Sequence, residues 1–182
     1  MTAGHHPSFI PPDDLDIPIW RYMDFAKFLT LLEDEVLFFP RARLLGDPFE
    51  GSAPKRTKLA EFAFAKSLEA DTGKPQIHEV VSTMESMRRK MVNNSFISCW
   101  HMNYHESAAM WSLYGGYGPA IAIQTTYRKI REHFPEYIFI GKVHYKNYET
   151  DVVGNANSFN FIMCKRKSFE HEQELRAVIW GG

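Results

Sequence analysis

Several features that would assign a protein to a class at once are scarce in this sequence. Its 182 residues include only two cysteines, Cys99 and Cys164, too few for a disulfide framework and at no zinc-binding spacing. The 21 basic and 22 acidic side chains leave a formal net charge of -1, so no overall field attracts nucleic acid or anionic lipid. Apolar runs such as residues 36–39 and 177–180 are too short to cross a bilayer. We therefore expect a cytoplasmic protein that enters no membrane and binds no nucleic acid.

The length and the aromatic content indicate one domain that includes a cleft. A chain of 182 residues suits a single core. Aromatic residues make up 14 % of it, so we expect some rings to line a cleft as well as to fill the core. Residues 1–16 lack the apolar run of a secretory signal and predict a flexible N-terminal arm. Residues 17–182 are expected to form the domain.

The order of the predicted elements favours an α+β fold. Strands and helices do not alternate as in a doubly wound protein, so we expect a mixed, mostly antiparallel sheet with helices packed around it. Asp24 is placed to cap the first helix. The predicted strands are residues 17–22, 36–39, 95–100, 120–124, 137–145 and 172–180, and the predicted helices are residues 25–34, 58–70, 77–92, 107–114, 127–133 and 157–165.

The last predicted strand carries the clearest polar pattern. Side chains alternate along a strand, so Glu172, Glu174 and Arg176 are expected on one face, followed by apolar residues. Carboxylates at alternate positions can divide two roles, one orienting a ligand and the other acting as a base or stabilising charge. The alternative is a solvated strand end with an Arg–Glu pair that contributes little.

Residues 95–101 combine small nucleophile-type side chains with an imidazole. Ser98 and Trp100 should share one strand face, and Ser95 and Cys99 the other. A Cys–His or Ser–His nucleophile would fit this composition, but no third orienting group is nearby. A buried structural Cys99 is the alternative that we favour.

Three further segments hold candidate binding groups. Trp111 and Tyr114 precede a glycine-rich turn and suit a flat ligand, although a helix end followed by a turn explains them equally well. Asp47 and Glu50 lie in a turn at residues 46–51 and could ligate a metal, but a rigid corner is the preferred interpretation. The basic run at residues 165–167 is interpreted as solvated surface that could meet phosphate. We predict no metal site.

Taken together, these segments resemble the bacterial family catalogued as domain of unknown function 2971. The resemblance runs from about Trp20 to Trp180 and rests on the order of its motifs. It implies no particular activity. The motifs are Gly46-Asp47-Pro48-Phe49-Glu50, Ser95-Phe96-Ile97-Ser98-Cys99-Trp100, Met110-Trp111-Ser112-Leu113-Tyr114, Val143-His144-Tyr145, and Lys167 with Glu172-Gln173-Glu174-Leu175-Arg176.

The chain is also similar, more distantly, to ADP-ribosyltransferases of the Arg-Ser-Glu type. That resemblance implies that Arg21 grips the phosphates of NAD. It further implies that Ser95 or Ser98 braces the ribose, and that Glu174 with Glu172 stabilises an oxocarbenium-like transition state. The rings of Tyr22, Trp100 and Tyr114 would then stack on nicotinamide or adenine. NAD would be a substrate, with a protein acceptor that the sequence does not name.

Three functions therefore remain open. The first is an ADP-ribosyltransferase-like or NAD glycohydrolase-like enzyme, and the second is a non-enzymatic module that binds a small molecule or a protein. The third is a metal-dependent phosphodiesterase that uses Asp47, Glu172 and Glu174. Arg176 argues against the third, because it would compete for the same carboxylate oxygens.

Overall fold

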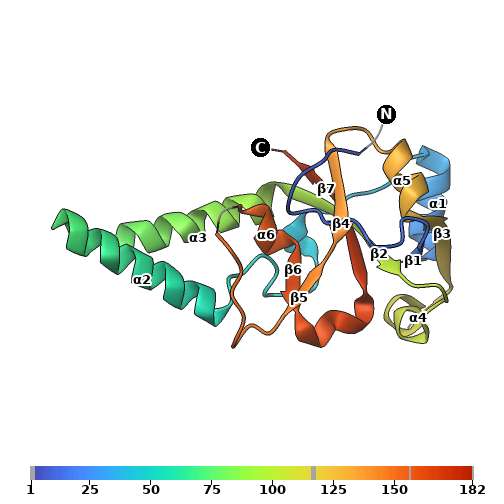
Figure 1. Ribbon diagram of the computed structural model, residues 1–182. Coiled ribbons are helices and arrows are strands. Elements are labelled where there is room, and N and C mark those ends of the chain that lie inside the picture. The colour runs from blue at the N-terminus through green and yellow to red at the C-terminus, as the bar shows by residue number, and fades with distance from the viewer. Residues whose placement is uncertain (1–2, 116–117, 156, 182) are drawn as a thin grey trace.

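The computed structural model describes residues 3–115, 118–155 and 157–181 and confirms the α+β fold (Figure 1). A five-stranded antiparallel sheet has the order β3-β1-β2-β7-β4. None of the helices in the described ranges combines the length and apolar character needed to cross a bilayer. The strands are β1 Pro18–Asp24, β2 Ser95–Met102, β3 Ala120–Thr126, β4 Ile138–Lys142 and β7 Glu174–Trp180.

Strand β7 lies inside the sheet, and its two faces lead to two different cores. Leu175 and Ala177 point into a core that is covered by α5 (Tyr127–His133). Val178 points into the second core, on the opposite face, which is covered by α3 (Ile77–Asn94) and α6 (Phe159–Ile162). Since strand side chains alternate, Glu174 and Arg176 belong to the same face as Val178.

Local signals explain where several elements begin and end. Helix α1 (Phe25–Asp34) begins where the Asp24 carboxylate accepts a hydrogen bond from the Lys27 backbone N–H, at 2.8 Å. Thr126 caps α5 in the same way through Lys129. Both helices have the boundaries that the sequence predicts.

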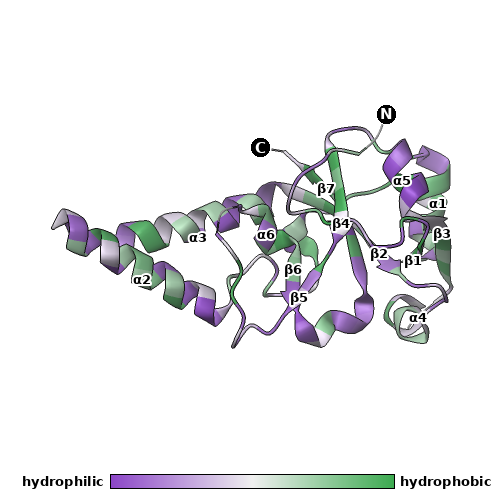
Figure 2. Cartoon of the chain, in the orientation of Figure 1, coloured by the Kyte–Doolittle hydropathy of each residue, from purple (hydrophilic) through white to green (hydrophobic). Residues whose placement is uncertain are grey.

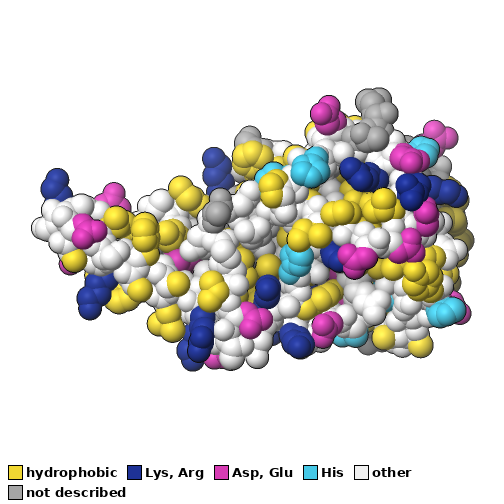
Figure 3. Space-filling view, viewed as in Figure 1, with side chains coloured by type: hydrophobic (Ala, Val, Ile, Leu, Met, Phe, Trp, Pro, Cys, Tyr) yellow, Lys and Arg dark blue, Asp and Glu magenta, His cyan; other side chains and the backbone are white. Residues whose placement is uncertain are grey.

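Helices α2 (Lys55–Thr72) and α3 form a long hairpin that projects from the sheet (Figure 1). Hydrophilic and hydrophobic residues alternate along it (Figure 2). Glu61 and Arg88 join the two helices through a buried ion pair, with 2.5 Å between Oε1 and Nη1. Apolar and charged side chains share its surface (Figure 3), and the exposed apolar ones are Leu59, Phe62, Phe64 and Met87.

The predicted strand at residues 137–145 is wrong as a single element. It divides into β4 and β5 (His144–Lys146), which belong to different sheets. The division falls at Val143, whose N–H donates to the Glu174 carbonyl, while the next N–H donates to Met163. Gly141 stays in register with Arg176 and forms no bulge. Glycine is needed at position 141, because a Cβ atom there would lie 2.6 Å from the Phe9 backbone.

Two other predictions near the C-terminus are also wrong in extent. The helix predicted at residues 157–165 shrinks to α6, because Cys164–Arg166 forms β6 and pairs with β5 in parallel. The strand predicted from residue 172 begins at Glu174. Glu172 instead ends the 3₁₀ helix η2 (Lys167–Glu172), and Gln173 turns the chain with a φ of 39°.

Residues 36–39 form no strand, contrary to the prediction. Pro40 has no N–H to donate to a ladder, although its carbonyl accepts a hydrogen bond from Ile97 of β2. Arg41 adds a single bridge to Phe96 before the 3₁₀ helix η1 (Ala42–Leu44). Pro40 and Arg41 therefore lie along the edge of β2 at the residues where β2 is no longer paired with β1.

The N-terminal segment is described from Ala3 and follows the edge of the sheet. The Ala3 N–H donates to Arg131, and the Gly4 N–H donates to Ile138 of β4. Ala3 and Phe9 are buried in the two cores. The mobility predicted for residues 1–16 stays a prediction.

Candidate functional site

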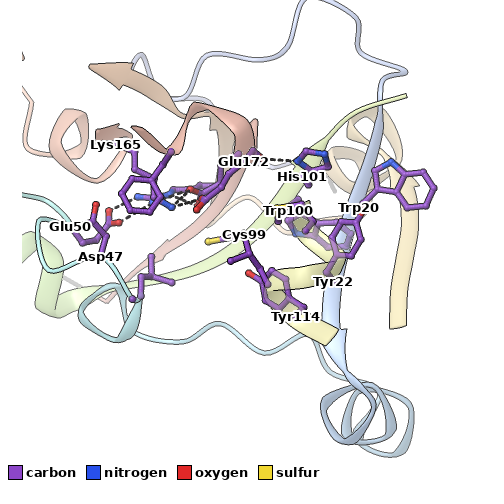
Figure 4. Close-up of a pocket in the computed structure, with 17 residues that line it drawn as sticks. Trp20, Tyr22, Asp47, Glu50, Cys99, Trp100, His101, Tyr114, Lys165 and Glu172 are labelled. Atoms are coloured by element: carbon purple, nitrogen blue, oxygen red, sulfur yellow. Dashed lines mark hydrogen bonds and ion pairs between the residues drawn. The ribbon is translucent and has the colours of Figure 1, made fainter. Parts of the chain in front are cut away.

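A cavity of about 370 Å³ opens where the start of β7 meets the end of β2, β1, helix α4 (Ala108–Gly115) and η2. We call it the acidic pocket. Charged groups gather on one side of it and rings on the other, with Cys99 between them (Figure 4). Its lining includes Trp20, Tyr22, Asp47, Glu50, Cys99, His101, Tyr114, Lys165, Phe169, Glu172, Glu174 and Arg176.

Arg176 organises the charged side. It is fully buried, and its Nε lies 2.7 Å from Glu174 Oε1. Its Nη2 lies 3.0 Å from Glu50 Oε2, and its Nη1 also donates to the Ile162 carbonyl. A guanidinium that is satisfied by two carboxylates and a carbonyl holds both carboxylates in fixed positions.

Glu174 is held in its ionised form. Its side chain is only 4 % exposed, and this burial by itself would raise its pKa. The charges of Arg176 and Lys165 outweigh burial and lower the pKa of Glu174 to about 2. The Lys165 Nζ lies 3.2 Å from Glu174 Oε2. Glu174 is therefore a fixed negative charge and not a proton donor at neutral pH.

The pKa of Glu50 is shifted in the opposite direction to that of Glu174. Burial raises the pKa of its carboxyl, and the opposing charge of Arg176 does not fully offset that effect. We expect Glu50 to be the first of these buried carboxylates to take up a proton as the pH falls.

Glu172 is the more accessible carboxylate of the predicted catalytic pair. Its side chain is 17 % exposed and binds Lys165, its one side-chain partner among the described residues. Because Glu172 ends η2, it approaches Lys165 from a different element than Glu174 does. The pair predicted on one strand face is thus brought together by Lys165.

Aromatic rings form the other side of the pocket. Tyr114 stacks on Tyr22 with 6.3 Å between ring centroids, and Trp111 packs edge-on against Tyr22 at 5.0 Å. The Tyr22 hydroxyl accepts a hydrogen bond from Ser107 N–H, which ties β1 to the segment before α4. Burial raises the pKa of Tyr114 to about 12, so its phenol stays neutral. Trp111 supports this wall from behind and is not part of the lining.

Cys99 is not an activated nucleophile. Burial, and next the charge of Glu174, raise its pKa well above the ordinary range, so the thiol keeps its proton. His101 Nδ1 lies 2.6 Å from the Glu172 carbonyl and must donate to it. The buried Nε2 of His101 has no partner among the described residues. Neither nitrogen of His101 hydrogen-bonds to Cys99, which agrees with the structural role that we favour for this cysteine.

The two predicted serines do not meet the carboxylates. Ser98 shares its face with Trp100, whose Nε1 donates to the Ser98 hydroxyl, and Trp100 belongs to the core on the α5 side. Ser95 is on the same face as Glu174 but pairs with Trp180, at the far end of the ladder from the His101–Glu174 pair. A ligand held by Glu174 would therefore meet Cys99 and His101 of β2 in place of either serine.

Arg21 also lies outside the acidic pocket. Its guanidinium donates to Ser98 and to the Phe38 carbonyl, and it lines a neighbouring cavity. That cavity shares Tyr22 and Tyr114 with the acidic pocket. The structure thus brings together Glu172, Glu174, Arg176, Tyr22, Trp100 and Tyr114 around the pocket, and leaves Arg21, Ser95, Ser98 and Trp111 out of its lining.

Sequence reasoning missed the partners of these carboxylates. The corner predicted at Asp47 is confirmed, because its carboxylate accepts a hydrogen bond from the Phe49 N–H at 3.0 Å. The prediction missed that Glu50 pairs with Arg176 and that Asp47 binds Arg166 at 2.9 Å. Lys165 and Arg166 were interpreted as solvated surface. No local pattern signals the other pairings, because Glu50 and Arg176 are 126 positions apart in the sequence and Asp47 and Arg166 are 119 apart.

Within the described ranges, no group of three or more His, Cys, Asp or Glu side chains is arranged to hold a metal ion. The carboxylates named for a phosphodiesterase, Asp47, Glu172 and Glu174, pair with Arg166, Lys165 and Arg176 instead.

Comparison with known proteins adds no assignment. No family model matches the chain, and no curated protein or solved structure shows detectable similarity to it. The two family resemblances noted from the sequence therefore stay predictions, and the function has to be argued from the site.

Proposed function

We propose that the acidic pocket binds a flat organic cation, of which the nicotinamide ring of NAD⁺ is the leading example. The observation that carries this proposal is an excess of negative charge beside aromatic walls. Asp47 is balanced by Arg166. Among the residues that the structure describes, the three remaining carboxylates, Glu50, Glu172 and Glu174, pair with two cations, Lys165 and Arg176, which leaves one negative charge uncompensated.

The volume and the lining residues of the acidic pocket suit a ligand that carries a small ring. A volume of about 370 Å³ is at the small end for ligand sites. Tyr114, which is 42 % exposed, offers a ring face that attracts a cation, and the buried Tyr22 ring is stacked against it. Glu172 is the accessible carboxylate and would face the positive charge directly. Glu174 and Glu50, held by Arg176, would add a fixed negative potential without reorganising.

The test is a calorimetric titration with a matched pair of ligands, the N-methylnicotinamide cation and neutral nicotinamide. We expect the cation to bind at least about tenfold more tightly, which corresponds to about 1.4 kcal/mol. Glu172→Gln should remove most of that preference, because it neutralises the accessible carboxylate. Equal affinity for the two rings would contradict the proposal.

A second candidate is an NAD glycohydrolase-like or ADP-ribosyltransferase-like enzyme, and the position of Glu172 favours it. Cleavage of the N-glycosidic bond releases neutral nicotinamide and develops positive charge at the ribose anomeric carbon. An accessible carboxylate beside a second, permanently ionised one can stabilise that charge. Water, or a nucleophile of a protein acceptor, would then add to this carbon and lose a proton.

Nicotinamide release from NAD⁺ separates the two candidates. An enzyme should release nicotinamide, and Glu172→Gln should abolish the release while NAD⁺ still binds weakly. If NAD⁺ binds and no nicotinamide appears, with or without candidate protein acceptors, the pocket serves binding alone.

A further inference from the structure

The neighbouring cavity arises where the sheet opens. Strands β1 and β2 are paired only at Ile19–Met102 and Trp20–His101. Beyond that point β1 continues with β3, while β2 is met by the segment around Pro40. The opening between them is a cavity of about 680 Å³, within the range of small-molecule sites. We call it the Arg21 chamber.

Arg21 is the half-buried cation of this chamber. Its guanidinium spans the opening, donating to the Ser98 hydroxyl on β2 and to the Phe38 carbonyl at 3.0 Å. No carboxylate within the described ranges lies at ion-pair distance from it, in contrast to Arg176. Burial lowers the pKa of Arg21, as expected for a desolvated cation. A guanidinium in this position lacks the anion that usually accompanies it.

The walls of the chamber are mostly aliphatic and partly open to solvent. Met23, Leu31 and Ile97 line it, together with Leu44, which is 68 % exposed, and Phe38, which is 69 % exposed. Exposed apolar side chains gathered around one cavity indicate a binding surface. Sugar hydroxyls and base edges need several convergent polar groups. Arg21 is half-buried here. Of the other polar lining groups, Lys27 pairs with Asp24, the Thr30 hydroxyl donates to the Ala26 carbonyl, and the Tyr22 hydroxyl accepts from Ser107 N–H. The remaining polar lining residues among those described are Asp34, Cys99 and Tyr114.

We infer that the Arg21 chamber binds an aliphatic carboxylic acid, with its carboxylate on the Arg21 guanidinium and its chain along the aliphatic walls. A planar guanidinium binds a carboxylate bidentately, and an alkyl chain matches the apolar side chains that form most of the wall. This inference is independent of the function proposed for the acidic pocket, because it rests on a different cavity.

The test is a calorimetric titration with decanoate, and with decanol as the uncharged ligand of the same chain length. Wild-type protein should bind decanoate. Arg21→Met keeps the side-chain length and should weaken decanoate by at least about tenfold, since the carboxylate would lose its charged partner. The affinity for decanol should be the same in both proteins.

Two further variants keep the test decisive if Arg21→Met is poorly folded. Leu44→Glu places a carboxylate on an exposed wall and should weaken decanoate by repulsion. Arg128→Met is the matched control, because Arg128 lines neither cavity and pairs with Asp16 at 2.7 Å, and it should leave decanoate binding unchanged. The inference is overturned if decanoate does not bind, if it binds Arg21→Met as tightly as the wild type, or if ADP-ribose displaces it from the wild type. The last result would assign the chamber to a nucleotide.

Discussion

The two cavities share a wall of Tyr22 and Tyr114 but treat charge in opposite ways. In the acidic pocket every buried ionic group has partners, and Arg176 binds two carboxylates at once. In the Arg21 chamber a single guanidinium meets a hydroxyl and a carbonyl, with no carboxylate at ion-pair distance among the described residues. The difference lies in where the counter-charges are placed, because each cavity contains an arginine, fully buried at Arg176 and half-buried at Arg21.

We expect the charges of the two cavities to serve different ends, folding stability in the acidic pocket and ligand binding in the Arg21 chamber. A buried charge with partners is expensive to disturb, because removing one partner leaves another charge uncompensated. A half-buried charge without a counter-ion, such as that of Arg21, is satisfied by neutral acceptors and is available to a ligand. We therefore expect substitutions in the acidic pocket to affect folding strongly, and substitution of Arg21 to affect ligand binding alone.

The largest expected effect is that of Glu174→Gln on stability. The change would leave Arg176 and Lys165 without their shared carboxylate, which should lower the free energy of unfolding by about 3 kcal/mol. Chemical denaturation of the variant and the wild type measures it. Glu172→Gln is the matched control, with an expected loss below about 1 kcal/mol. Equal losses of unfolding free energy for the two variants would show that Glu174 is not central to the ion pairs of Arg176 and Lys165.

The free energy of unfolding, measured as a function of pH, tests the contribution of Glu174 in a second way. The pKa of Glu174 is lowered from 4.5 to about 2 on folding, so its ionised form stabilises the fold above pH 4.5. That contribution, on the order of 3 kcal/mol, should fade as the pH falls from 4.5 toward 2. The stability difference between the wild type and Glu174→Gln should shrink over this window. A difference that does not change with pH would contradict the assignment.

Binding of the cation should also depend on pH, through Glu50. Burial raises the pKa of Glu50, which faces Arg176, Glu174 and Lys165. As the pH falls, Glu50 should take up a proton before Glu174 does and remove the excess negative charge. The affinity for the N-methylnicotinamide cation should therefore fall at acidic pH by about tenfold while the protein is still folded. Calorimetry at a series of pH values, with circular dichroism to monitor folding, checks this. An affinity that does not vary would place the cation elsewhere.

The smallest expected effect is that of Arg21→Met on the acidic pocket. If the two cavities act separately, the affinity for the N-methylnicotinamide cation should change by less than about twofold, or less than about 0.5 kcal/mol. A large change would show that one ligand spans both cavities, as the resemblance to ADP-ribosyltransferases implies.

The fold could be predicted from the sequence where local signals decide it. The caps at Asp24 and Thr126 and the helical spacing after them fix α1 and α5. Residues 36–39 have strand-like composition, but the partner edge is taken only at Pro40 and Arg41. The division of residues 137–145 depends on β6, which no local pattern announces.

The site was predicted less well, because its charges come from distant segments. Glu172, Glu174 and Arg176 were found from their spacing, although the turn at Gln173 takes Glu172 off the strand. Glu50 and Lys165 reach this cluster only through tertiary packing. The alternation rule placed Ser98 with Trp100 correctly, but the face on which Glu174 lies could not be known without the register of β2 and β7.

The most direct test of the central claim is to compare NAD⁺ with NADH by their effect on the melting temperature of the wild-type protein. The two ligands differ mainly in the positive charge of the nicotinamide ring, which the acidic pocket is proposed to recognise. The account predicts that NAD⁺ raises the melting temperature and that NADH at the same concentration does so clearly less. An equal rise with both, or a larger rise with NADH, would contradict it.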